Sequence, residues 1–352
     1  MFEKDYSFPI GNFVVEDPAR TFHFIPYNVQ YCDVCKTTQT KYLGDLNLIY
    51  EDNFAGAYGS IRNTMNDLFA NFILENKNVR DILEIGAGNG SLSESILDKS
   101  SNSYTIVDPS YCGPKEKRCI VPTFFENYKE PSSSNTVVMS HVYEHFYDPC
   151  LILEKIKELQ DVDYVYLSFP DLEGFIKEGV YHVLNPEHTF YVENEFIVNL
   201  FDYFNFKLGR TYSHKNHSIF FEFIRDKESK STKAFPKNRT AVEDTRHFFE
   251  RVLENVETAN KSVEGEVYMW PCSMHSLFCL SLGLRRDGIR SVLDNSPLKI
   301  GKYLYGYGYI CESFSTVINS EEPKTILLTG GCYNTEIQTQ VKANSKNKVI
   351  VL

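Results

Sequence analysis

The sequence has no run of about 18 apolar residues, the length from which a transmembrane helix is recognised. Its first residues, Met1 to Phe13, include charged side chains and contain no apolar core of the kind found in secretory signals. A tract rich in Lys and Arg is also absent, and 36 basic residues against 47 acidic ones give a formal net charge of −11. Because non-specific binding to nucleic acid requires clustered cations, we expect no nucleic-acid partner. We also expect no membrane partner and a cytoplasmic location.

Cysteine is too sparse for a disulfide scaffold, with nine residues scattered over a chain of 352. Tryptophan occurs once, whereas phenylalanine occurs 26 times and tyrosine 23 times. These aromatic residues suit large cores and pockets that stack on flat ligands. Apolar residues make up 42% and charged residues 24% of the chain, which is the composition of an ordinary globular protein. The length is sufficient for two or three domains.

Strand and helix patterns alternate between about residues 60 and 225, which is typical of a parallel sheet covered by helices. The predicted strands are 81–85, 104–107, 119–121, 136–140 and 164–169, and one predicted helix is 149–160. Two further strands, 206–212 and 218–224, are separated by a short polar turn and should pair as an antiparallel hairpin. We therefore predict an α/β fold whose mostly parallel sheet ends in a hairpin.

Composition divides the chain into four parts. Residues 1–58 are loop-rich and aromatic, and we expect them to form a small N-terminal domain. Residues 59–225 hold the predicted sheet, and residues 226–264 comprise a Lys- and Ser-containing linker followed by a long helix predicted over 241–263. Residues 265–352 repeat the strand-helix pattern, which predicts a second α/β domain.

A glycine-rich turn follows the first predicted strand of the sheet. The segment Leu83–Gly90 reads LEIGAGNG and leads into a predicted helix over 91–97. Glycines let the backbone turn sharply and approach a ligand closely, and the start of the helix offers free N–H groups. The next strand ends at Asp108, where a carboxylate can accept both hydroxyls of a ribose. A glycine turn alone also serves structural purposes, but the full arrangement predicts a nucleoside site.

The acid within the strand, Glu84, distinguishes between nucleoside cofactors. It would repel a pyrophosphate but suits the cationic amino-acid end of S-adenosylmethionine (SAM), reached through water. The pattern E-x-G-x-G-x-G resembles motif I of the class I SAM-dependent methyltransferases, and the terminal hairpin is also similar to that family's. The resemblance implies a Rossmann-like, seven-stranded sheet, SAM as cofactor and S-adenosylhomocysteine (SAH) as its product. The cofactor-binding residues that we predict are Glu84, Gly86, Ala87, Gly88, Asn89, Gly90, Asp108, Phe124, Phe125, Ser140 and His141. Phe124 and Phe125 would contact the adenine ring or, alternatively, belong to the core.

Two segments after the fourth strand contain histidines next to acids. His145 lies in SHVYEHFYDP, and Glu187 and His188 lie in LNPEHTFY, before the helix that precedes the hairpin. Loops at the carboxyl ends of parallel strands are where such folds meet their ligands. Histidine is suited to moving protons near neutral pH, and Glu187 could raise the basicity of His188. The alternative for a loop histidine is a surface or hydrogen-bonding role.

Three stretches spread over nearly the whole chain carry a second resemblance. They are YCDVCKTTQT at 31–40, the Glu187–His188 pair, and VLDNSPLKIGKY at 292–303. Together they resemble the three-part sugar C-methyltransferases, which methylate carbon 3 of nucleotide-linked 4-keto-6-deoxy sugars. The resemblance implies a nucleotide-diphosphate sugar as substrate. It also implies that His188, tuned by Glu187, removes the proton next to the ketone, and that His145 lies near the keto oxygen.

The chain departs from this family at two sites. The family binds zinc through two C-x-x-C pairs, and this chain has only Cys32 and Cys35 of them. Two ligands do not close a structural site, so we expect no zinc and predict no metal ligands. Asn185 stands where the family has tyrosine, and His141 where it commonly has asparagine. Because an amide and a phenol differ in acidity and reach, Asn185 is a candidate catalytic residue. O-methylation of a nucleotide-linked sugar stays an alternative, as does an inactive relative that binds a nucleotide sugar or a partner protein.

Residues outside the predicted methyltransferase domain are candidates for substrate contacts. Tyr50 and Tyr58 belong to the N-terminal segment, which would cover the substrate, although core packing is the alternative for both. The C-terminal part resembles a Rossmann-like domain that holds the nucleotide of the sugar substrate. Lys299, Lys302 and Tyr303 would contact its diphosphate or base, or else lie on the solvated surface.

Overall fold

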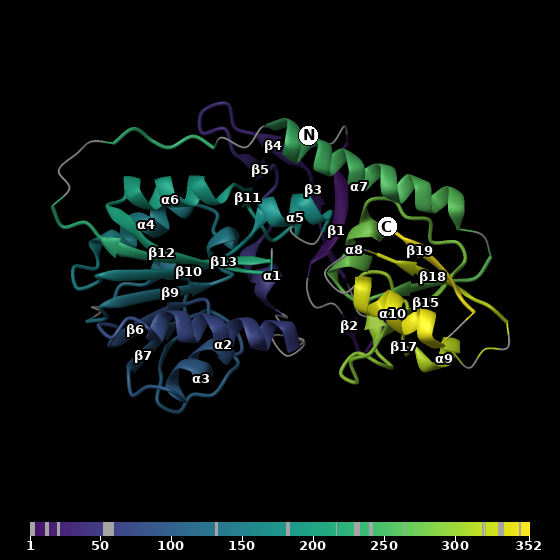
Figure 1. Cartoon of the computed structure of the whole chain (residues 1–352), viewed down its shortest axis with the longest axis horizontal. Helices are drawn as coiled ribbons and strands as arrows, with labels where there is room; N and C mark the ends of the chain where they lie inside the picture. Colours follow the sequence, from purple (N-terminus) through teal and green to yellow (C-terminus); the bar gives the residue numbers. More distant parts are fainter. Residues whose placement is uncertain are drawn as a thin grey trace.

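The computed structural model describes residues 4–10, 14–19, 22–51, 60–130, 133–180, 184–215, 217–228, 233–238, 242–263, 265–318, 320, 322–329, 334–344 and 346–352. Tyr58, a predicted substrate contact, lies outside these residues. Two sheets covered by helices lie side by side, and strands from the start of the chain lie between them (Figure 1). None of the helices in the described ranges has both the length and the apolar character that crossing a membrane requires.

The larger sheet has seven strands in the order β12-β13-β10-β9-β6-β7-β8. Their bounds are β6 Asp81–Ile85, β7 Ser103–Val107, β8 Cys119–Val121, β9 Thr136–Ser140, β10 Tyr164–Pro170, β12 Phe206–His214 and β13 Ser218–Arg225. The first five pair in parallel, and β13 pairs antiparallel with both β10 and β12. The predicted mostly parallel sheet with a terminal hairpin is therefore confirmed, and β12 extends two residues further than the pattern indicated.

Side chains that alternate along these strands form two cores, one on each face of the sheet. One core joins β6 residues such as Ile82 to α2 (Ser60–Leu74) and α3 (Ser91–Leu97). The other core joins Leu83, and the strand residues that point to the same face of the sheet, to α4 (Pro149–Glu158) and α6 (Asn194–Tyr203). The start of α4 is fixed locally, because the Asp148 side chain accepts a hydrogen bond from the backbone N–H of Leu151 and Pro149 takes the first helical position.

A second sheet of five parallel strands has the order β17-β15-β14-β18-β19. The strands are β14 Val267–Trp270, β15 Ile289–Asp294, β17 Cys311–Ser313, β18 Thr325–Leu328 and β19 Lys348–Val351. The helices of this half are α7 Val242–Ser262, α8 Met274–Ser281, α9 Ser315–Ile318 and α10 Asn334–Asn344. The strand-helix series predicted from Val267 onward is thus present as a second parallel sheet.

The N-terminal segment packs into both halves of the molecule. Its elements are β1 Tyr6–Ile10, β2 Val14–Val15, β3 His23–Tyr27, β4 Val29–Tyr31, β5 Thr38–Thr40 and α1 Leu46–Glu51. Phe8 and Tyr27 pack against Phe278 of α8, and β2 pairs with β16 (Tyr303–Leu304). On the other side, β5 pairs with β11 (Phe190–Tyr191), directly after the predicted base. The described part of this segment therefore shares its core with its neighbours.

The sheet order reverses between β6 and β9, since chain connections leave β6 for β7 on one side and arrive at β9 on the other. A crevice for ligands opens outside the carboxyl ends of the strands at such a switch point. The glycine turn follows β6, and the Ser140–His145 segment follows β9. Both predicted motifs therefore meet at this edge.

Candidate active site

The glycine turn after β6 is held in a conformation that only glycines adopt readily. Gly86, Gly88 and Gly90 all have positive φ angles, of 71°, 57° and 77°. A Cβ on Gly86 would lie 2.4 Å from Val142 Cγ2, and one on Gly90 would lie 2.6 Å from the Tyr111 hydroxyl oxygen. The turn is therefore bare backbone packed against its neighbours, and its residues fit the predicted close approach of a nucleoside.

Asp108, at the end of β7, lies against the glycine turn. Its carboxylate accepts hydrogen bonds from the backbone N–H groups of Gly88 and Ser110, each at 2.7 Å. Burial raises the pKa of this carboxyl, and the bonds from the backbone act in the opposite direction. The backbone N–H of Ala87 also bonds to this carboxylate. A carboxylate has about four lone-pair sites, so about one remains for a ribose hydroxyl. The position fits the predicted role, which stays a prediction.

Glu84 is more deeply buried than the sequence indicated. Its side chain is 1% exposed and accepts a hydrogen bond from the Tyr104 hydroxyl at 2.9 Å. Burial raises the pKa of the carboxyl to about 7, against the lowering effect of the Tyr104 bond. Asn89 has a local role, because its Oδ1 accepts bonds from the backbone and the hydroxyl of Ser91 at the start of α3. In the structure, the Glu84 and Asn89 side chains thus make their hydrogen bonds within the protein, next to the glycine turn.

The two phenylalanines after β8 differ in their surroundings. Phe125 is 2% exposed and stacks on Tyr128 in the core, so it presents almost no surface to a ligand. Phe124 is partly exposed, and its ring contacts that of Tyr50 at 6.2 Å between centroids. The backbone carbonyl of Tyr50 also accepts a bond from the Ser110 hydroxyl at 3.2 Å. α1 thus lies across the edge of the sheet beside Asp108.

Tyr50 connects the nucleoside side of the crevice to the histidine side. Burial raises the pKa of its phenol well above 10, and the charges of Glu187, Tyr147 and Asp108 add to this effect. The phenol therefore keeps its proton at neutral pH. It can therefore donate a hydrogen bond, and its role as a substrate contact stays a prediction.

The loop that carries the predicted base is shaped by Asn185. The side-chain oxygen of Asn185 accepts a hydrogen bond from the backbone N–H of Glu187 at 3.0 Å. The backbone carbonyl of Asn185 accepts one from the backbone N–H of His188, also at 3.0 Å. The same carbonyl accepts a bond from the Tyr191 hydroxyl, which also contacts the Tyr27 hydroxyl at 2.9 Å. Asn185 therefore turns the chain so that Glu187 and His188 project from one loop.

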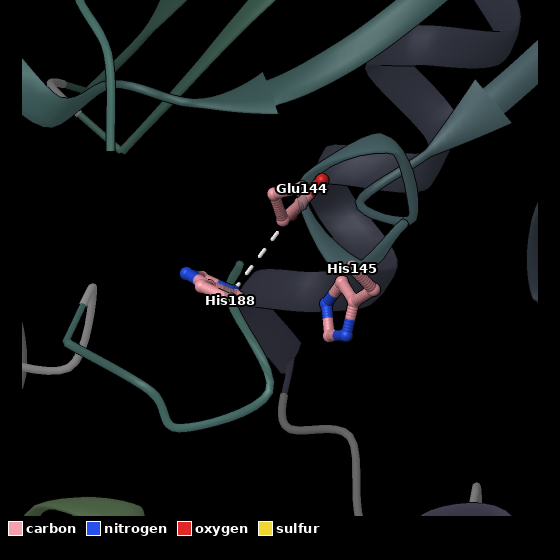
Figure 2. A group of neighbouring side chains, drawn as sticks. All are labelled: Glu144, His145 and His188. Atoms are coloured by element: carbon pink, nitrogen blue, oxygen red, sulfur yellow. Dashed lines mark ion pairs between the residues drawn. The ribbon is translucent and has the colours of Figure 1, made fainter. Parts of the chain in front are cut away.

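Two acids and two histidines from separate loops form a cluster, of which Figure 2 shows Glu144, His145 and His188. His145 Nδ1 lies 3.6 Å from Glu187 Oε2, and His188 Nε2 lies 4.0 Å from Glu144 Oε1. The rings of His145 and His188 meet edge to face at 5.0 Å. Thr189 joins the loops, because its backbone N–H and its hydroxyl donate to the carbonyls of Glu144 and Phe146. The structure thus brings His145, Glu187 and His188 close together, but the acid that it places beside the His188 ring is Glu144, whereas Glu187 lies beside His145. The predicted tuning of His188 by Glu187 stays a prediction.

Glu187 provides a pH-dependent test of this cluster. Burial raises the pKa of its carboxyl to about 7, although 23% of the side chain is exposed. The folded state therefore retains a proton that the unfolded chain releases near its ordinary pKa, and stability falls as the pH rises from about 4.5 to about 7. Glu187→Gln removes this loss. We expect the free energy of unfolding of the variant, relative to wild type, to rise by roughly 1–3 kcal/mol between about pH 5 and pH 8.

Urea denaturation at several pH values measures this difference. Glu94→Gln, on the exposed face of α3, is the matched control and should show no such trend. A Glu187→Gln difference that is constant with pH would contradict the burial of the carboxyl.

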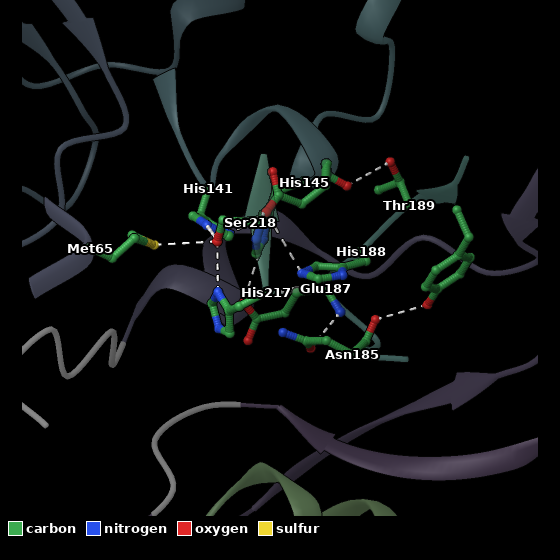
Figure 3. A network of polar contacts seen from close by, with 11 residues as sticks. Met65, His141, His145, Asn185, Glu187, His188, Thr189, His217 and Ser218 are labelled. Atoms are coloured by element: carbon green, nitrogen blue, oxygen red, sulfur yellow. Dashed lines mark hydrogen bonds and ion pairs between the residues drawn. The ribbon is translucent and has the colours of Figure 1, made fainter. Parts of the chain in front are cut away.

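Three residues of the site were not predicted from the sequence, namely Glu144, Ser218 and His217. Glu144 is 1% exposed and its Oε1 lies 3.3 Å from His141 Nδ1. The other ring nitrogen of His141 lies 2.9 Å from the Ser218 hydroxyl, which lies 2.6 Å from His217 Nδ1. His141 and Glu144 follow β9, whereas His217 and Ser218 lie at the start of β13. Figure 3 shows Ser218 between the two rings. The Glu144–His145 pair in the sequence was a signal that could have identified Glu144. His217 and Ser218 belong to a polar hairpin turn, and nothing in the sequence distinguishes that turn from others.

Metal ligation can be examined at two places. Among the described residues, Cys32 and Cys35 belong to no group of three His, Cys, Asp or Glu whose ligand atoms lie within 4.8 Å of one another, and the absence of zinc stays a prediction. Cys35 instead contacts the Thr37 hydroxyl at 3.0 Å. Glu144, His145 and His188 place one ligand atom each within 4.8 Å of one another, a spacing at which three residues could hold a metal ion.

The predicted substrate residues of the C-terminal half have partners within the protein. The Lys299 ammonium pairs with Asp294 at 2.8 Å and donates to the Cys272 carbonyl at 2.8 Å. It therefore ties the loop after β15 to the end of β14. Lys302 lies 3.6 Å from Glu16 and Tyr303 pairs with β2. Contacts of these three with a diphosphate or base stay a prediction.

Comparison with known proteins supports the assignment of the larger sheet. Residues 58–210 match the family model described as a methyltransferase domain. Solved structures of similar fold include the mitomycin 7-O-methyltransferase MmcR, with 17% identity, a TM-score of 0.39 and coverage of 49% of this chain and 56% of that chain. Another is 1,6-didemethyltoxoflavin-N1-methyltransferase from Burkholderia thailandensis, with 13% identity, a TM-score of 0.40 and coverage of 56% and 98%. A search of proteins with curated descriptions finds no match.

The sheet order, the glycine turn and the acid after β7 agree with this family match. The order, with the antiparallel hairpin at one edge, is the arrangement that the resemblance to class I methyltransferases implied. Motif and match cover the same part of the chain. Residues 58–210 are therefore similar to a methyltransferase domain.

Proposed function

We propose that the protein transfers the methyl group of SAM to a nucleotide-linked deoxysugar, at the carbon next to a keto group. The observation that carries this proposal is the cluster of Glu144, His145, Glu187 and His188 beside the nucleoside crevice. An acceptor carbon must lose a proton before it can attack a methyl group. A site with two histidines and two buried or half-buried acids is suited to that step.

The chain's residues divide the work in this proposal. Gly86, Gly88 and Asp108 hold the nucleoside, and Tyr50 donates a hydrogen bond where cofactor and acceptor meet. Bound SAM supplies the methyl group as an electrophile. His188 removes the acceptor proton, and His145 donates to the oxygen on which negative charge develops.

The N-terminal segment supports an enclosed acceptor site. β5 pairs with β11, and the backbone N–H of Thr40 donates to the Thr189 carbonyl at 2.9 Å. The Tyr147 hydroxyl donates to the carbonyl of Gly44. These contacts hold the segment over the loop of the base. Excluding water in this way strengthens the electrostatic interactions that stabilise an enolate.

Incubation with SAM and a panel of nucleotide-linked sugars tests the proposal. We expect methylation of a 4-keto-6-deoxy sugar, with the new methyl group on carbon 3 by mass spectrometry and NMR. Matched sugars in which the ketone is reduced to a hydroxyl serve as controls and should give no product. Methylation of the hydroxy sugars alone would contradict the carbon acceptor.

O-methylation is the second candidate, because a site that removes a proton from carbon can also remove one from a hydroxyl. His141 and Asn185, which replace residues of the sugar C-methyltransferases, are the observation that favours it. The position of the methyl group in the product distinguishes the two. An inactive binding protein is distinguished earlier, since calorimetry would then detect no SAH binding.

A further inference from the structure

The Glu144 carboxyl has surroundings that are unusual for a buried acid. Neither of its oxygens accepts a well-aligned hydrogen bond from any residue that the structure describes, and the side chain is 1% exposed. Burying an acid without hydrogen bonds is costly, and such groups require an explanation. His141 and His188 both direct a ring nitrogen at the same oxygen, at 3.3 Å and 4.0 Å. The carboxyl therefore lies between two groups that can each give or accept a proton.

Ser218 extends this contact on the far side of His141. Its hydroxyl lies 2.9 Å from His141 Nε2, 2.6 Å from His217 Nδ1 and 3.4 Å from the sulfur of Met65. The hydroxyl has a single proton, and the thioether can only accept. The hydroxyl can donate to the Met65 sulfur, in which case both rings donate to it. When it donates to one ring instead, the other ring must donate to it. In the latter case the hydroxyl donates either to His141 or to His217. These two arrangements differ only in the positions of protons along the contacts, and a proton relay alternates between two such states.

The fold maintains this geometry at a conformational cost. His141 has a φ of 51°, which is uncommon for a residue other than glycine. Its backbone N–H donates to the Ser168 carbonyl at 2.9 Å, so β9 and β10 fix its position. Ser218 begins β13, and the ring of His217 contacts Phe175 at 5.5 Å. His217 is partly exposed, so the line of contacts leads from the buried base toward the surface.

We propose that Glu144, His141, Ser218 and His217 form a relay that exports the proton taken up by His188. The inference rests on the proposed function, because it assumes that His188 is the base. The acceptor C–H bond breaks and its proton goes to His188, while its electron pair forms the new bond to the methyl carbon. The bond between that carbon and the sulfonium sulfur breaks, and its electron pair stays on sulfur, which leaves as SAH. His188 then passes a proton from Nε2 to Glu144, whose carboxyl gives one to His141 Nδ1. His141 releases the proton on Nε2 to Ser218, and Ser218 gives its own to His217. One proton moves outward and each intermediate group ends with the proton count it had at the start.

The longest contact in this line is the one between His188 and Glu144. Catalytic hydrogen bonds are often loose before the substrate is bound and tighten in the complex. A movement of about 1 Å brings the 4.0 Å separation into hydrogen-bond range. The relay residues act through His188 and touch no reacting atom, so their role is to move protons and to position the base.

Turnover with and without added imidazole tests the relay. We expect Ser218→Ala and His217→Ala to lower kcat by about 10- to 100-fold, with the KM for SAM and the Kd for SAH unchanged. Imidazole in the buffer should restore much of the kcat of His217→Ala, because it can accept the proton at the surface. A purely structural defect would not respond in this way. Ser168→Ala is the matched control, since Ser168 is buried on β10 and its hydroxyl has no hydrogen-bond partner among the described residues.

Several results would overturn the relay. Ser218→Ala with wild-type kcat, or His217→Ala without any response to imidazole, would each do so. Loss of activity on chelation, regained with zinc or manganese alone, would assign Glu144, His145 and His188 to a metal ion instead. If the wild-type protein methylates no sugar of the panel, the proposed function fails and NMR of isotope-labelled histidine decides on the relay without an acceptor. Ser218→Ala should then alter the imidazole signals of both His141 and His217, and unchanged signals would refute the relay.

Discussion

Replacement of His188 by alanine is expected to lower kcat by about 10²- to 10⁴-fold, which is the range that a positioned general base contributes. The Kd for SAH should remain within about twofold of wild type, because His188 belongs to the loop before β11 and lies outside the glycine turn. Glu187→Gln should lower kcat less, since Glu187 contacts His145 and shares the loop with the base. Stopped assays with SAM and the best sugar of the panel measure these changes.

His247→Ala is the control for His188→Ala, because His247 is exposed on α7. It should have no effect on kcat. Turnover within a few-fold of wild type in both His188→Ala and Glu187→Gln would show that another group removes the proton.

Gly86→Ala is expected to weaken SAH binding by about 100-fold or more, measured by calorimetry. The residue has a φ of 71°, and an added Cβ would lie 2.4 Å from Val142 Cγ2. The left-handed conformation alone costs roughly 1–2 kcal/mol for alanine. The contact with Val142 must also be relieved, and a shift of the glycine turn would disturb the proposed nucleoside site.

Gly179→Ala separates these two effects. Gly179 ends α5 (Leu172–Glu178) with a φ of 67°, and a Cβ there would meet nothing within 4 Å. We expect it to reduce stability without changing the Kd for SAH. Adding Val142→Ala to Gly86→Ala should recover part of the binding. If Gly86→Ala alone bound SAH as tightly as wild type, the turn would not be the cofactor site.

The strands and the cofactor motif could be predicted from the sequence because they depend on local patterns. Short apolar runs that end in glycine or an acid define β6 and β7, and these two strands match their predicted bounds to within one residue. The same holds for Gly86, Gly88 and Asp108, whose roles follow from backbone freedom and from position at a strand end. These features need no knowledge of which strands are neighbours.

The remainder of the site depends on the order of the strands. Glu144, His141 and Ser218 meet only because β13 lies beside β10 and β10 beside β9. Periodicity gives the strands but not this order, so Ser218 and His217 could not be connected to His141. Lys299 was predicted to contact the substrate because of the motif in which it lies. In the structure, its ammonium group pairs with Asp294 and donates to the Cys272 carbonyl. A charged side chain in a sequence does not reveal its partner.

The pairing of β5 with β11 has a consequence for how the protein reaches its working form. The loop of His188 is completed by strands from the start of the chain, far away in the sequence. Such distant contacts form late, because a long loop must close before they contribute stability. During synthesis β5 can pair with β4 early, but its other edge stays unpaired until β11 has been made. We therefore expect the large sheet to assemble first and catalytic competence to be acquired last, when the amino-terminal segment docks.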